Sequence, residues 1–558
     1  MVSKRVVIVG GVAGGASCAA RLRRLDEKAE IFVFERGGFV SFANCGMPYF
    51  IGGVITPQQR LLVATPERFR DFFNVEIRVN HEVERIDRQN KLVHVLNHQS
   101  GARFTRPYDA LVLSPGAKPI VPEVPGVNLP GVFSLRLLED AGDIYRWLEG
   151  RKVTRAVVVG GGYIGLEMTE NLVRRGISTV LLEAADQLML PLDPEMTAPI
   201  HAALSAHDVV VRLRSPLRGI EETASGLQVL AGDGEKFPCQ IVILATGVRP
   251  ETTLAAEAGL EIGELGGIRV DEQMRTTRDP AIWAVGDAVE VPDVVTGGLT
   301  RVPLAGPASR QARVAADAIC GRPTRFRGVQ GTAVVGLFDL VIAQTGANEK
   351  QLKGRNIPYM VSYTHSTDHA AYYPGAEPLT IKLLFAPDWG RILGAQVVGG
   401  RGVDKRIDVI SAFIQKGGTV YDLEEAELCY APQFGSARDP VNIAGFAAGN
   451  ILRKDVLPAY WSEWSSALSD QSPLVIDVRT PGEHAAGAPP GAINIPLGEI
   501  RGRLHELPRD REIWVHCGVG QRSYYAYRIL TQHGFRVRNL SGGYKSWLAC
   551  KAVRRGDR

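Results

Sequence analysis

The sequence lacks the features of several protein classes. None of its seven cysteines form a CxxC pair, so we expect neither a zinc site nor a thioredoxin-type redox pair. No apolar run reaches the ~18 residues that a membrane-spanning helix needs. The 64 basic residues nearly balance the 60 acidic ones, which gives no reason to expect a nucleic-acid or membrane partner. Residues 1–5 lead directly into an apolar strand without a secretory hydrophobic region, so we expect a cytoplasmic protein.

Two glycine-rich turns organise the chain of 558 residues, a length that suggests about three to four domains. One spans residues 10–15 and the other spans residues 160–165, and each follows a short apolar run and precedes a helix-like segment. This arrangement directs the N–H groups of a helix N-terminus at the pyrophosphate of a dinucleotide. Two such sites in one chain suggest electron transfer from a nicotinamide to a flavin.

The second turn fits the GxGxxG pattern completely, with Gly160, Gly162 and Gly165. Glu183 stands 23 residues after Gly160, close to the ~20 expected for a ribose-binding carboxylate. A carboxylate accepts the 2′-hydroxyl of NADH and repels the 2′-phosphate of NADPH. We therefore predict an NADH site, the alternative being a tight strand–helix turn without a ligand.

The first turn departs from the pattern because Val12 replaces its second glycine. Glu35 nevertheless follows Gly10 by 25 residues, and Asp287 follows an apolar strand where a ribitol or phosphate chain could lie. FAD is longer than NAD and can use such an additional contact. We predict an FAD site formed by Gly10, Gly15, Glu35, Arg36, Gly116, Gly247 and Asp287.

The repeated pattern predicts an α/β protein in which one dinucleotide-binding domain is inserted into another. A Gly-, Val- and Tyr-rich region follows, and a small α/β unit of about 90 residues ends the chain. The predicted domains are FAD-binding at 1–117 and 241–325, NADH-binding at 118–240, an α+β dimerisation domain at 326–450, a linker at 451–466 and a C-terminal domain at 467–558.

Cys45 lies in the motif SFANCGMPY of residues 41–49. With the two turns, this motif resembles the flavoprotein disulfide reductases, and in particular their coenzyme A disulfide reductase branch, over roughly residues 1–450. Many members of the family carry a CxxxxC pair, but here Phe50 occupies the second position. We therefore expect Cys45 to form a mixed disulfide or persulfide with its substrate, or a sulfenate. Related NADH oxidases and peroxidases also have one cysteine, but they share a histidine in the first turn where this chain has Ala13.

The resemblance also implies a homodimer and a set of substrate contacts. Tyr372 and Tyr430 are expected to present hydroxyls to the sulfur across the dimer interface, with Tyr373 as the alternative to Tyr372. Packing at an interface is the other explanation for these tyrosines. The residues expected to contact coenzyme A are Arg21, Arg24, Ser41 and Asn44, although the two arginines also suit a solvated helix face.

The C-terminal unit resembles a rhodanese domain in residues 477–484 and 491–496. Cys517 begins the loop CGVGQRS directly after a strand that ends at His516. Its glycines allow backbone N–H groups to face one sulfur, and with Arg522 they are expected to stabilise a persulfide anion.

Together these features suggest an FAD- and NADH-dependent reductase of coenzyme A persulfides or polysulfides, releasing hydrogen sulfide, or of coenzyme A disulfide. The C-terminal domain would transfer sulfur, with a sulfur-donor protein as a possible partner, and no metal, nucleic acid or membrane is expected. Two alternatives remain: an NADH oxidase or peroxidase, and a reductase whose rhodanese domain is a non-catalytic docking module. The sequence leaves open whether coenzyme A is tightly bound, and whether Cys517 serves Cys45 of its own or of another subunit.

Overall fold

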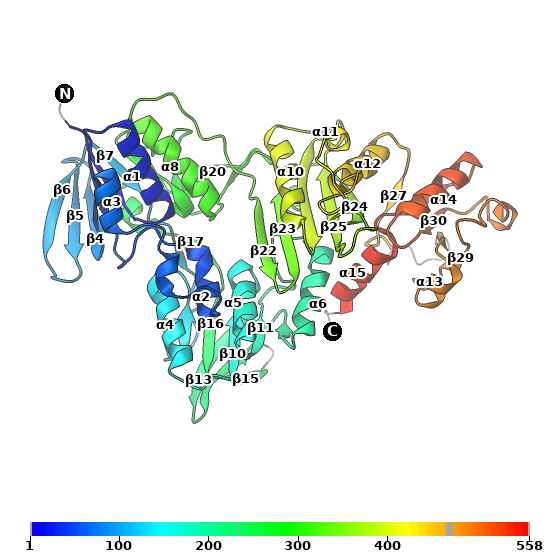
Figure 1. Cartoon of the computed structure of the whole chain (residues 1–558), viewed down its shortest axis with the longest axis horizontal. Coiled ribbons are helices and arrows are strands. Elements are labelled where there is room, and N and C mark those ends of the chain that lie inside the picture. The colour runs from blue at the N-terminus through cyan, green and yellow to red at the C-terminus, as the bar shows by residue number, and fades with distance from the viewer. Residues whose placement is uncertain (1–2, 233, 465–472, 556–558) are drawn as a thin grey trace. The chain divides into compact units, whose positions relative to one another are not determined.

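The computed structural model describes residues 3–232, 234–464 and 473–555 (Figure 1). Its backbone contacts divide the chain into two units, residues 1–185 with 208–329, and residues 186–207 with 330–558. Within the described ranges, no helix is long and apolar enough to cross a membrane.

The first unit begins with a parallel five-stranded sheet. Four of its five strands have almost continuous buried apolar runs, as expected where helices cover both faces. Helix α1 (Ala13–Leu25) follows the central strand and packs against α8 (Ala305–Ile319) (Figure 1). The strand order is β19 (Ile282–Ala284), β7 (Ala110–Leu113), β1 (Arg5–Val9), β2 (Glu30–Phe34) and β3 (Glu76–Arg78).

A second parallel sheet in this unit repeats the pattern, with α5 (Tyr163–Arg174) after its central strand. Its order is β12 (Val210–Arg212), β11 (Ser178–Leu182), β10 (Arg155–Val159), β16 (Ile241–Leu244) and β9 (Val132–Ser134). Strand β16 was predicted to begin the second half of the FAD-binding domain. That boundary is wrong, because β16 pairs with β10 and belongs to the second dinucleotide-binding domain.

Shorter elements complete the first unit. Three small antiparallel groups are β4 (His81–Asp87), β5 (Leu92–Asn97) and β6 (Arg103–Pro107); β13 (Leu217–Thr223), β14 (Gly226–Ala231) and β15 (Lys236–Cys239); and β17 (Val248–Pro250) with β8 (Ala117–Pro119). A mixed group contains β18 (Ile268–Arg269), β20 (Val289–Pro292) and β21 (Leu299–Thr300). The remaining helices are η1 (Asn44–Gly46), α2 (Met47–Ile51), η2 (Gln58–Leu61), α3 (Pro66–Phe73), α4 (Leu138–Glu149), α7 (Thr253–Glu257) and η4 (Gly286–Ala288).

The second unit contains an antiparallel five-stranded sheet with helices, which is the predicted α+β architecture. Residues 186–207, which contribute η3 (Pro194–Thr197) and α6 (Ala198–Ala206), belong to this unit. The strand order is β22 (Ala333–Leu337), β23 (Leu340–Gly346), β26 (Ile392–Gly399), β25 (Pro378–Phe385) and β24 (Met360–Thr367). The helices are α9 (Glu349–Gly354), α10 (Val403–Gln415), α11 (Val420–Glu425) and α12 (Pro440–Leu452).

A parallel sheet forms the C-terminal domain in the same unit. Its order is β27 (Pro458–Ala459), β31 (Val537–Leu540), β30 (Ile513–His516), β28 (Leu474–Asp477) and β29 (Ile493–Asn494). Its helices are α13 (Pro481–Ala485), η5 (Leu504–Glu506), α14 (Gln521–Gln532) and α15 (Gly543–Arg555).

The predicted linker at 451–466 needs correction. Strand β27 pairs with β31, and Trp461 is 3% exposed in the core of the C-terminal domain. The aromatic side chain and the strand pairing therefore make residues 458–461 part of this domain. Residues 465–466 of that linker, and residues 467–472 of the predicted domain, lie outside the described ranges.

Candidate functional site

Both glycine turns require glycine for steric reasons. Gly10 and Gly160 have φ values of +92° and +110°, a region that side chains disfavour. A Cβ at Gly15 would lie 1.8 Å from the Gly10 carbonyl oxygen, and one at Gly165 would lie 1.8 Å from that of Gly160. Because glycine has no Cβ, each helix can start close to the preceding strand.

The helix N-termini at the two turns fit a diphosphate. Neither the N-cap Val12 of α1 nor the N-cap Gly162 of α5 receives a side-chain cap. The first N–H groups of each helix are thus free of a side-chain acceptor, and the helix dipole favours an anion there. A Cβ at Gly162 would meet nothing within 4 Å, so this position opens onto space that a ligand can enter.

A carboxylate from the next strand lies at each turn, as predicted. Glu35 accepts hydrogen bonds from the N–H of Gly11 at 2.8 Å and of Gly37 at 2.8 Å. Glu183 accepts one from Gly161 at 2.7 Å. Burial raises the pKa of Glu35, while these N–H groups oppose the rise. Both carboxylates are thereby fixed beside the turn.

Two residues predicted to contact coenzyme A, Ser41 and Asn44, and one predicted for the FAD site, Asp287, are linked by hydrogen bonds and an ion pair around the first turn. The Ser41 N–H donates to the Gly11 carbonyl at 2.9 Å. The Asn44 amide donates to the carbonyl of Arg136 at 3.5 Å, and the Arg136 guanidinium forms an ion pair with Asp287 at 3.0 Å. Arg136 was missed in the sequence because no motif surrounds it.

Gly116 and Gly247 both have positive φ, at +72° and +101°.

The predicted arginines differ in their surroundings: Arg36 and Arg24 are exposed. Arg21, predicted to bind a coenzyme A phosphate, forms an ion pair with Asp317 at 2.8 Å. A phosphate at Arg21 would therefore compete with this carboxylate.

Cys45 lies in η1, immediately before α2. Its side chain reaches the surface, yet partial burial raises the pKa of the thiol, and the nearby carboxylate of Glu167 raises it further. Phe50, at the position of a second cysteine in paired motifs, is buried and stacks on Tyr145 with ring centres 4.8 Å apart.

Two polar residues beside Cys45 were not among the predicted site residues. The hydroxyl of Tyr49 on α2 donates to Glu167 Oε1 on α5 at 3.5 Å. Burial raises the pKa of Glu167 to about 7 and that of Tyr49 to about 12. The available sequence signal was a carboxylate two residues after Gly165, on the helix of the GxGxxG motif.

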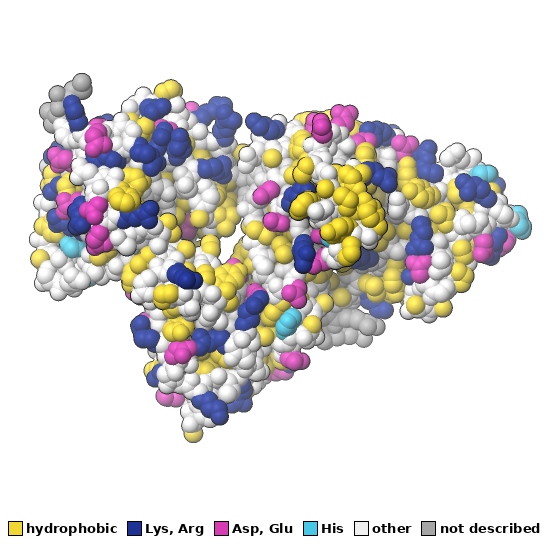
Figure 2. Space-filling model, viewed as in Figure 1, with side chains coloured by type: hydrophobic (Ala, Val, Ile, Leu, Met, Phe, Trp, Pro, Cys, Tyr) yellow, Lys and Arg dark blue, Asp and Glu magenta, His cyan; other side chains and the backbone are white. Residues whose placement is uncertain are grey.

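The second unit brings two predicted tyrosines together. The hydroxyls of Tyr372 and Tyr430 lie 2.7 Å apart, and both side chains are exposed. Tyr373 instead packs its ring edge-on against His369. Phe434 is likewise exposed, at 66%. Figure 2 shows hydrophobic side chains gathered on one face of the molecule. The pairing favours Tyr372 over Tyr373 as the residue that acts with Tyr430.

The Cys517 loop directs two hydrogen-bond donors at the Cys517 sulfur. Cys517 is buried, and its Sγ accepts hydrogen bonds from the N–H of Gly520 at 3.2 Å and the hydroxyl of Ser523 at 3.5 Å. The Arg522 guanidinium pairs with Glu483 at 2.6 Å. This pairing raises the pKa of Arg522, and the adjacent Cys517 contributes to the rise.

Buried polar groups surround the strand that precedes Cys517. Asp477 binds Arg479 at 2.6 Å and His484 at 2.9 Å. His516, directly before Cys517, is fully buried, and burial lowers its pKa to about 4. The neutral imidazole therefore adds no charge beneath the loop.

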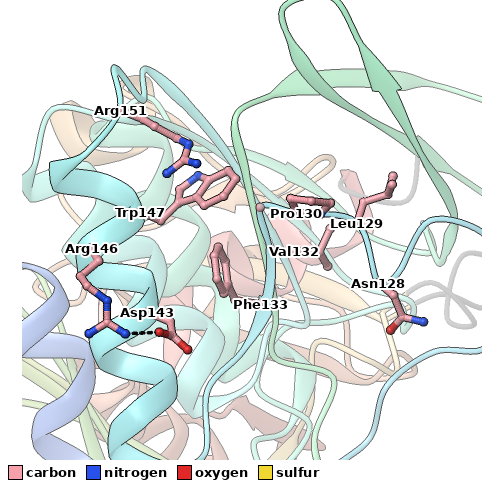
Figure 3. Close-up of a pocket in the computed structure, with 10 residues that line it drawn as sticks. Asn128, Leu129, Pro130, Val132, Phe133, Asp143, Arg146, Trp147 and Arg151 are labelled. Carbon is pink, nitrogen blue, oxygen red and sulfur yellow. Dashed lines mark hydrogen bonds and ion pairs between the residues drawn. The ribbon is translucent and has the colours of Figure 1, made fainter.

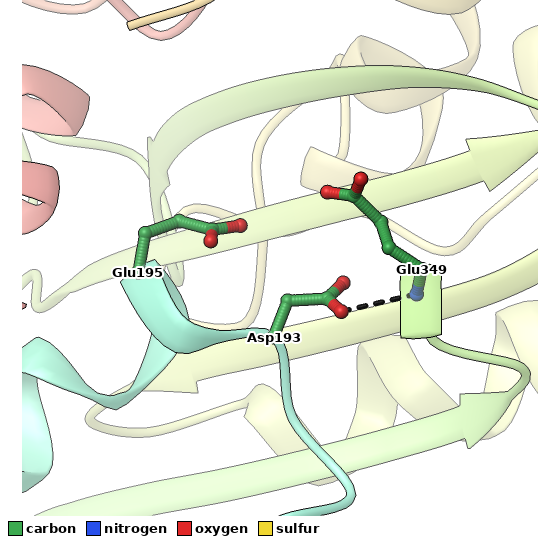
Figure 4. Close-up of side chains that lie close together, drawn as sticks. All are labelled: Asp193, Glu195 and Glu349. Carbon is green, nitrogen blue, oxygen red and sulfur yellow. Dashed lines mark hydrogen bonds between the residues drawn. The ribbon is translucent and has the colours of Figure 1, made fainter. Parts of the chain in front are cut away.

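One acidic group in the described part of the chain has the geometry of a metal site, namely Asp193, Glu195 and Glu349 (Figure 4). Lys382 Nζ, which is fully buried, lies 2.8 Å from Asp193, 2.5 Å from Glu195 and 2.6 Å from Glu349. The ammonium group takes the position that a metal ion would need.

A surface hollow of about 440 Å³ is also separate from the predicted site residues (Figure 3). Arg151 covers the indole of Trp147 there, 3.7 Å from the ring centre.

Comparison with known families agrees with this geometry. Residues 4–312 match the pyridine nucleotide-disulphide oxidoreductase family, more than half of the chain. Residues 332–440 match the dimerisation domain of that family, and residues 461–550 match the rhodanese-like domain. This chain is a pyridine nucleotide-disulphide oxidoreductase. The predicted fold class and enzyme class are thereby confirmed.

The oxidoreductase resembles two solved structures over nearly its whole length. Reduced Bacillus anthracis CoADR-RHD is 46% identical with a TM-score of 0.97, covering 100% of this chain and 99% of that one. The NAD-dependent persulfide reductase from A. fulgidus is 36% identical with a TM-score of 0.90, covering 97% and 100%.

Curated relatives of the oxidoreductase cover about four fifths of the chain. Coenzyme A disulfide reductase of Staphylococcus epidermidis is 34% identical over 445 residues, 80% of this chain and 99% of the relative. An NADH oxidase of Methanocaldococcus jannaschii is 35% identical over 454 residues, 81% of this chain and 99% of the relative.

The oxidoreductase family uses FAD and NAD(H), and the two helix N-termini with their carboxylates fit these cofactors. Gly10, Gly15, Glu35 and Asp287 would hold FAD. Gly160, Gly162, Gly165 and Glu183 would hold the nicotinamide dinucleotide.

Proposed function

We propose that this oxidoreductase uses NADH to reduce coenzyme A persulfides or polysulfides to coenzyme A and hydrogen sulfide, and that it also accepts coenzyme A disulfide. Its reductase half would act through Cys45, and its rhodanese domain would transfer sulfane sulfur through Cys517. The observation that carries the proposal is the combination of one accessible thiol lacking a motif partner with a second thiol in a sulfur cradle. A sulfane carrier has no evident task in plain disulfide reduction.

The sulfur chemistry follows from a single thiolate. Cys45 Sγ attacks the inner sulfur of coenzyme A persulfide, the S–S bond breaks, and hydrosulfide leaves with its electron pair. Cys45 is then joined to coenzyme A by a disulfide, which must be reduced because no motif cysteine can resolve it. When bound, FAD would supply the two electrons that this reduction needs, taken from NADH. The products are the Cys45 thiolate and coenzyme A thiolate, which takes up a proton.

Contacts to coenzyme A are proposed for Ser41, Asn44 and the arginines Arg21 and Arg24. Support comes from the position of Ser41 and Asn44 beside the first turn and Cys45. Arg24 is exposed and free to meet a phosphate, whereas Arg21 would exchange Asp317 for it. Glu183 supports NADH over NADPH, because its carboxylate disfavours a 2′-phosphate.

A homodimer is proposed because the matched dimerisation domain carries the exposed pair of Tyr372 and Tyr430. Their hydroxyls are 2.7 Å apart, so one can donate to the other while the second donates to a substrate sulfur. Cys517 would load sulfur onto coenzyme A, and fusion of the two domains raises the effective concentration of each for the other. Cys517 is cradled by N–H and hydroxyl donors that suit an anionic persulfide.

The test compares purified holoenzyme with its Cys45→Ser variant. NADH oxidation and sulfide release are followed with coenzyme A persulfide and, separately, coenzyme A disulfide. We expect Cys45→Ser to lose both reactions by several orders of magnitude. Cys320→Ser, at a half-buried thiol after α8, is the matched control and should retain them. Full sulfide release by Cys45→Ser would refute the proposal.

An NADH oxidase is the second candidate, because one relative carries that name. It predicts rapid NADH consumption with oxygen alone and no increase on adding persulfide.

The other alternative is that the rhodanese domain serves only for docking. In that case Cys517→Ser would leave sulfur transfer from every donor unchanged.

A further inference from the structure

The sulfur of Cys517 is held by neutral donors, and a cation lies beside the same loop. Cys517 Sγ accepts hydrogen bonds from the N–H of Gly520 at 3.2 Å and the hydroxyl of Ser523 at 3.5 Å. Arg522 lies in the first turn of α14, and a Cβ at Gly518 would lie 3.5 Å from its Nη2. The guanidinium is therefore close enough to act on an anion that approaches the sulfur.

Glu483 binds both arms of this guanidinium. Arg522 Nη1 donates to Oε2 at 2.8 Å and Nη2 donates to Oε1 at 2.6 Å, which makes a bidentate pair. Thr480 fixes the carboxylate, because its N–H and its hydroxyl each donate to Oε2 at 3.0 Å in the capping box of α13. The hydrogen bonds from Arg522 and Thr480 lower the pKa of Glu483 to about 2, so the carboxylate is ionised at neutral pH. Its negative charge offsets the positive charge of Arg522.

Two other basic side chains of this domain have different surroundings. Arg479 pairs with Asp477 at 2.6 Å, and its side chain is buried. Burial lowers the pKa of Lys545 on α15. Burial also lowers the pKa of His365 on β24, and Lys545 adds to that effect, so its charge acts on the antiparallel sheet. Arg522 is therefore the cation whose availability to a substrate depends on a single carboxylate at the loop.

Sulfur donors differ in the charge that they bring to this loop. In loading, the Cys517 thiolate attacks the terminal sulfur of the donor, the S–S bond breaks, and its electron pair leaves on the other sulfur. Thiosulfate brings two negative charges and leaves as sulfite. Coenzyme A persulfide brings at most one charge at its sulfur end and leaves as a thiolate, because its phosphates lie at the far end of the pantetheine arm. Like charges a few ångströms apart repel, so a dianion gains more from an unpaired cation than a thiol persulfide does.

We propose that Glu483 sets the donor specificity of the C-terminal domain: by offsetting the charge of Arg522, it favours thiol persulfides over dianionic donors such as thiosulfate. Glu483 acts through Arg522 and is a positioning residue. Because sulfur exchange is reversible, the same preference holds when Cys517 passes sulfur to a thiol. The inference rests on the proposed sulfur transfer through Cys517 and names the class of its donor.

The test measures the loading of Cys517 in full-length holoenzyme without NADH, so that reduction at Cys45 does not turn over. Protein is mixed with thiosulfate or with coenzyme A persulfide, alkylation stops the reaction, and mass spectrometry of the peptide carrying Cys517 gives the rate of persulfide formation. Glu483→Gln removes the charge but keeps an acceptor for Thr480, since glutamine also serves in a capping box. We expect loading from thiosulfate to be about tenfold faster and loading from coenzyme A persulfide to change less than about threefold.

Glu506→Gln is the matched control. Glu506 forms a bidentate pair with Arg503 at 2.9 Å and 2.8 Å, and in both pairs the arginine side chain is 37% exposed and the glutamate side chain 40%. This variant should leave loading from both donors unchanged. Combining Glu483→Gln with Arg522→Gln should remove the gain with thiosulfate. The gain should also shrink as salt rises from about 0.01 M to about 1 M, a dependence that a packing defect would not show.

Three results would overturn the proposal. The first is equal thiosulfate loading in wild type and Glu483→Gln, or an equal effect of Glu506→Gln. The second is a gain that survives in the double variant, which would assign it to another cation such as Lys545. The third is slower loading from both donors, which would mean that Glu483 only caps α13. Failure of the proposed function would show differently, as no persulfide at Cys517 of the wild type with either donor.

Discussion

Lys382 offers the sharpest stability prediction, because its ammonium group is fully buried among three carboxylates. Methionine has a similar volume but no charge. Lys382→Met would therefore keep the packing of β25 while leaving Asp193, Glu195 and Glu349 without their shared cation. Breaking a buried ion pair by removing one partner costs about 3–5 kcal/mol. We expect the free energy of unfolding of the antiparallel sheet to fall by that amount at pH 7.

The stabilisation that Lys382 provides depends on pH in a definite direction. Burial lowers the pKa of Lys382, but Tyr363 and the three carboxylates outweigh burial and raise it, so the stabilisation by Lys382 is present below its ordinary pKa of 10.5 and is lost at higher pH. Lys382 helps lower the pKa of Glu349 to about 2. The stabilisation from the ionised Glu349 carboxylate is therefore present above its ordinary pKa of 4.5 and disappears as the pH falls through about 2. In the variant the carboxylates take up protons at higher pH. The difference between wild type and variant should therefore be largest from about pH 5 to pH 10 and should narrow toward acid.

Amide hydrogen exchange read by mass spectrometry reports the opening of β25 and β26 directly, without a two-state assumption for the whole chain. The expected decrease in the free energy of unfolding corresponds to amide exchange that is faster by about a hundredfold or more. Lys353→Met is the control, because Lys353 pairs with Glu349 at 3.1 Å but is 66% exposed. It should cost no more than about 1 kcal/mol. Exchange in Lys382→Met within threefold of wild type at pH 7 would refute the reasoning.

Three further predictions concern the sites. In Gly165→Ala the new Cβ would lie 1.8 Å from the Gly160 carbonyl oxygen, so NADH binding should weaken at least tenfold while flavin content is retained; a titration with NADH and the flavin absorbance measure the two. Glu183→Ala should narrow the preference for NADH over NADPH in kcat/KM by about tenfold or more, and an unchanged ratio would exclude Glu183 from ribose recognition. Cys517→Ser should abolish sulfur transfer from thiosulfate while NADH-dependent reduction of coenzyme A disulfide continues, and retained transfer would place the carrier sulfur elsewhere.

The parallel sheets and the local geometry of the glycine turns could be predicted from the sequence. A strand, a glycine turn and a carboxylate about 20 residues later are close in the chain, so their geometry follows from local rules. The Cys517 loop is similar, since Gly520 and Ser523 follow Cys517 by only three and six residues.

Interactions between distant segments could not be predicted in this way. Arg136 meets Asp287 across 151 residues, and Tyr49 meets Glu167 across 118. The strand β16 was assigned to the wrong domain because its apolar run fits either sheet equally well, and only its pairing with β10 decides. Arg21 was predicted to be free for phosphate because nothing near it in sequence reveals Asp317.

The pairing of β27 with β31 sets a limit on how the sulfur-transfer half can be separated from the rest. Cutting the polypeptide at residue 467 would leave the edge of β31 without its hydrogen-bonding neighbour and would strip Trp461 from the aromatic group around His516 and Trp547. An excised fragment must therefore start ahead of Pro458 to remain folded. A shorter fragment that proved inactive would reveal nothing about whether Cys517 can work alone.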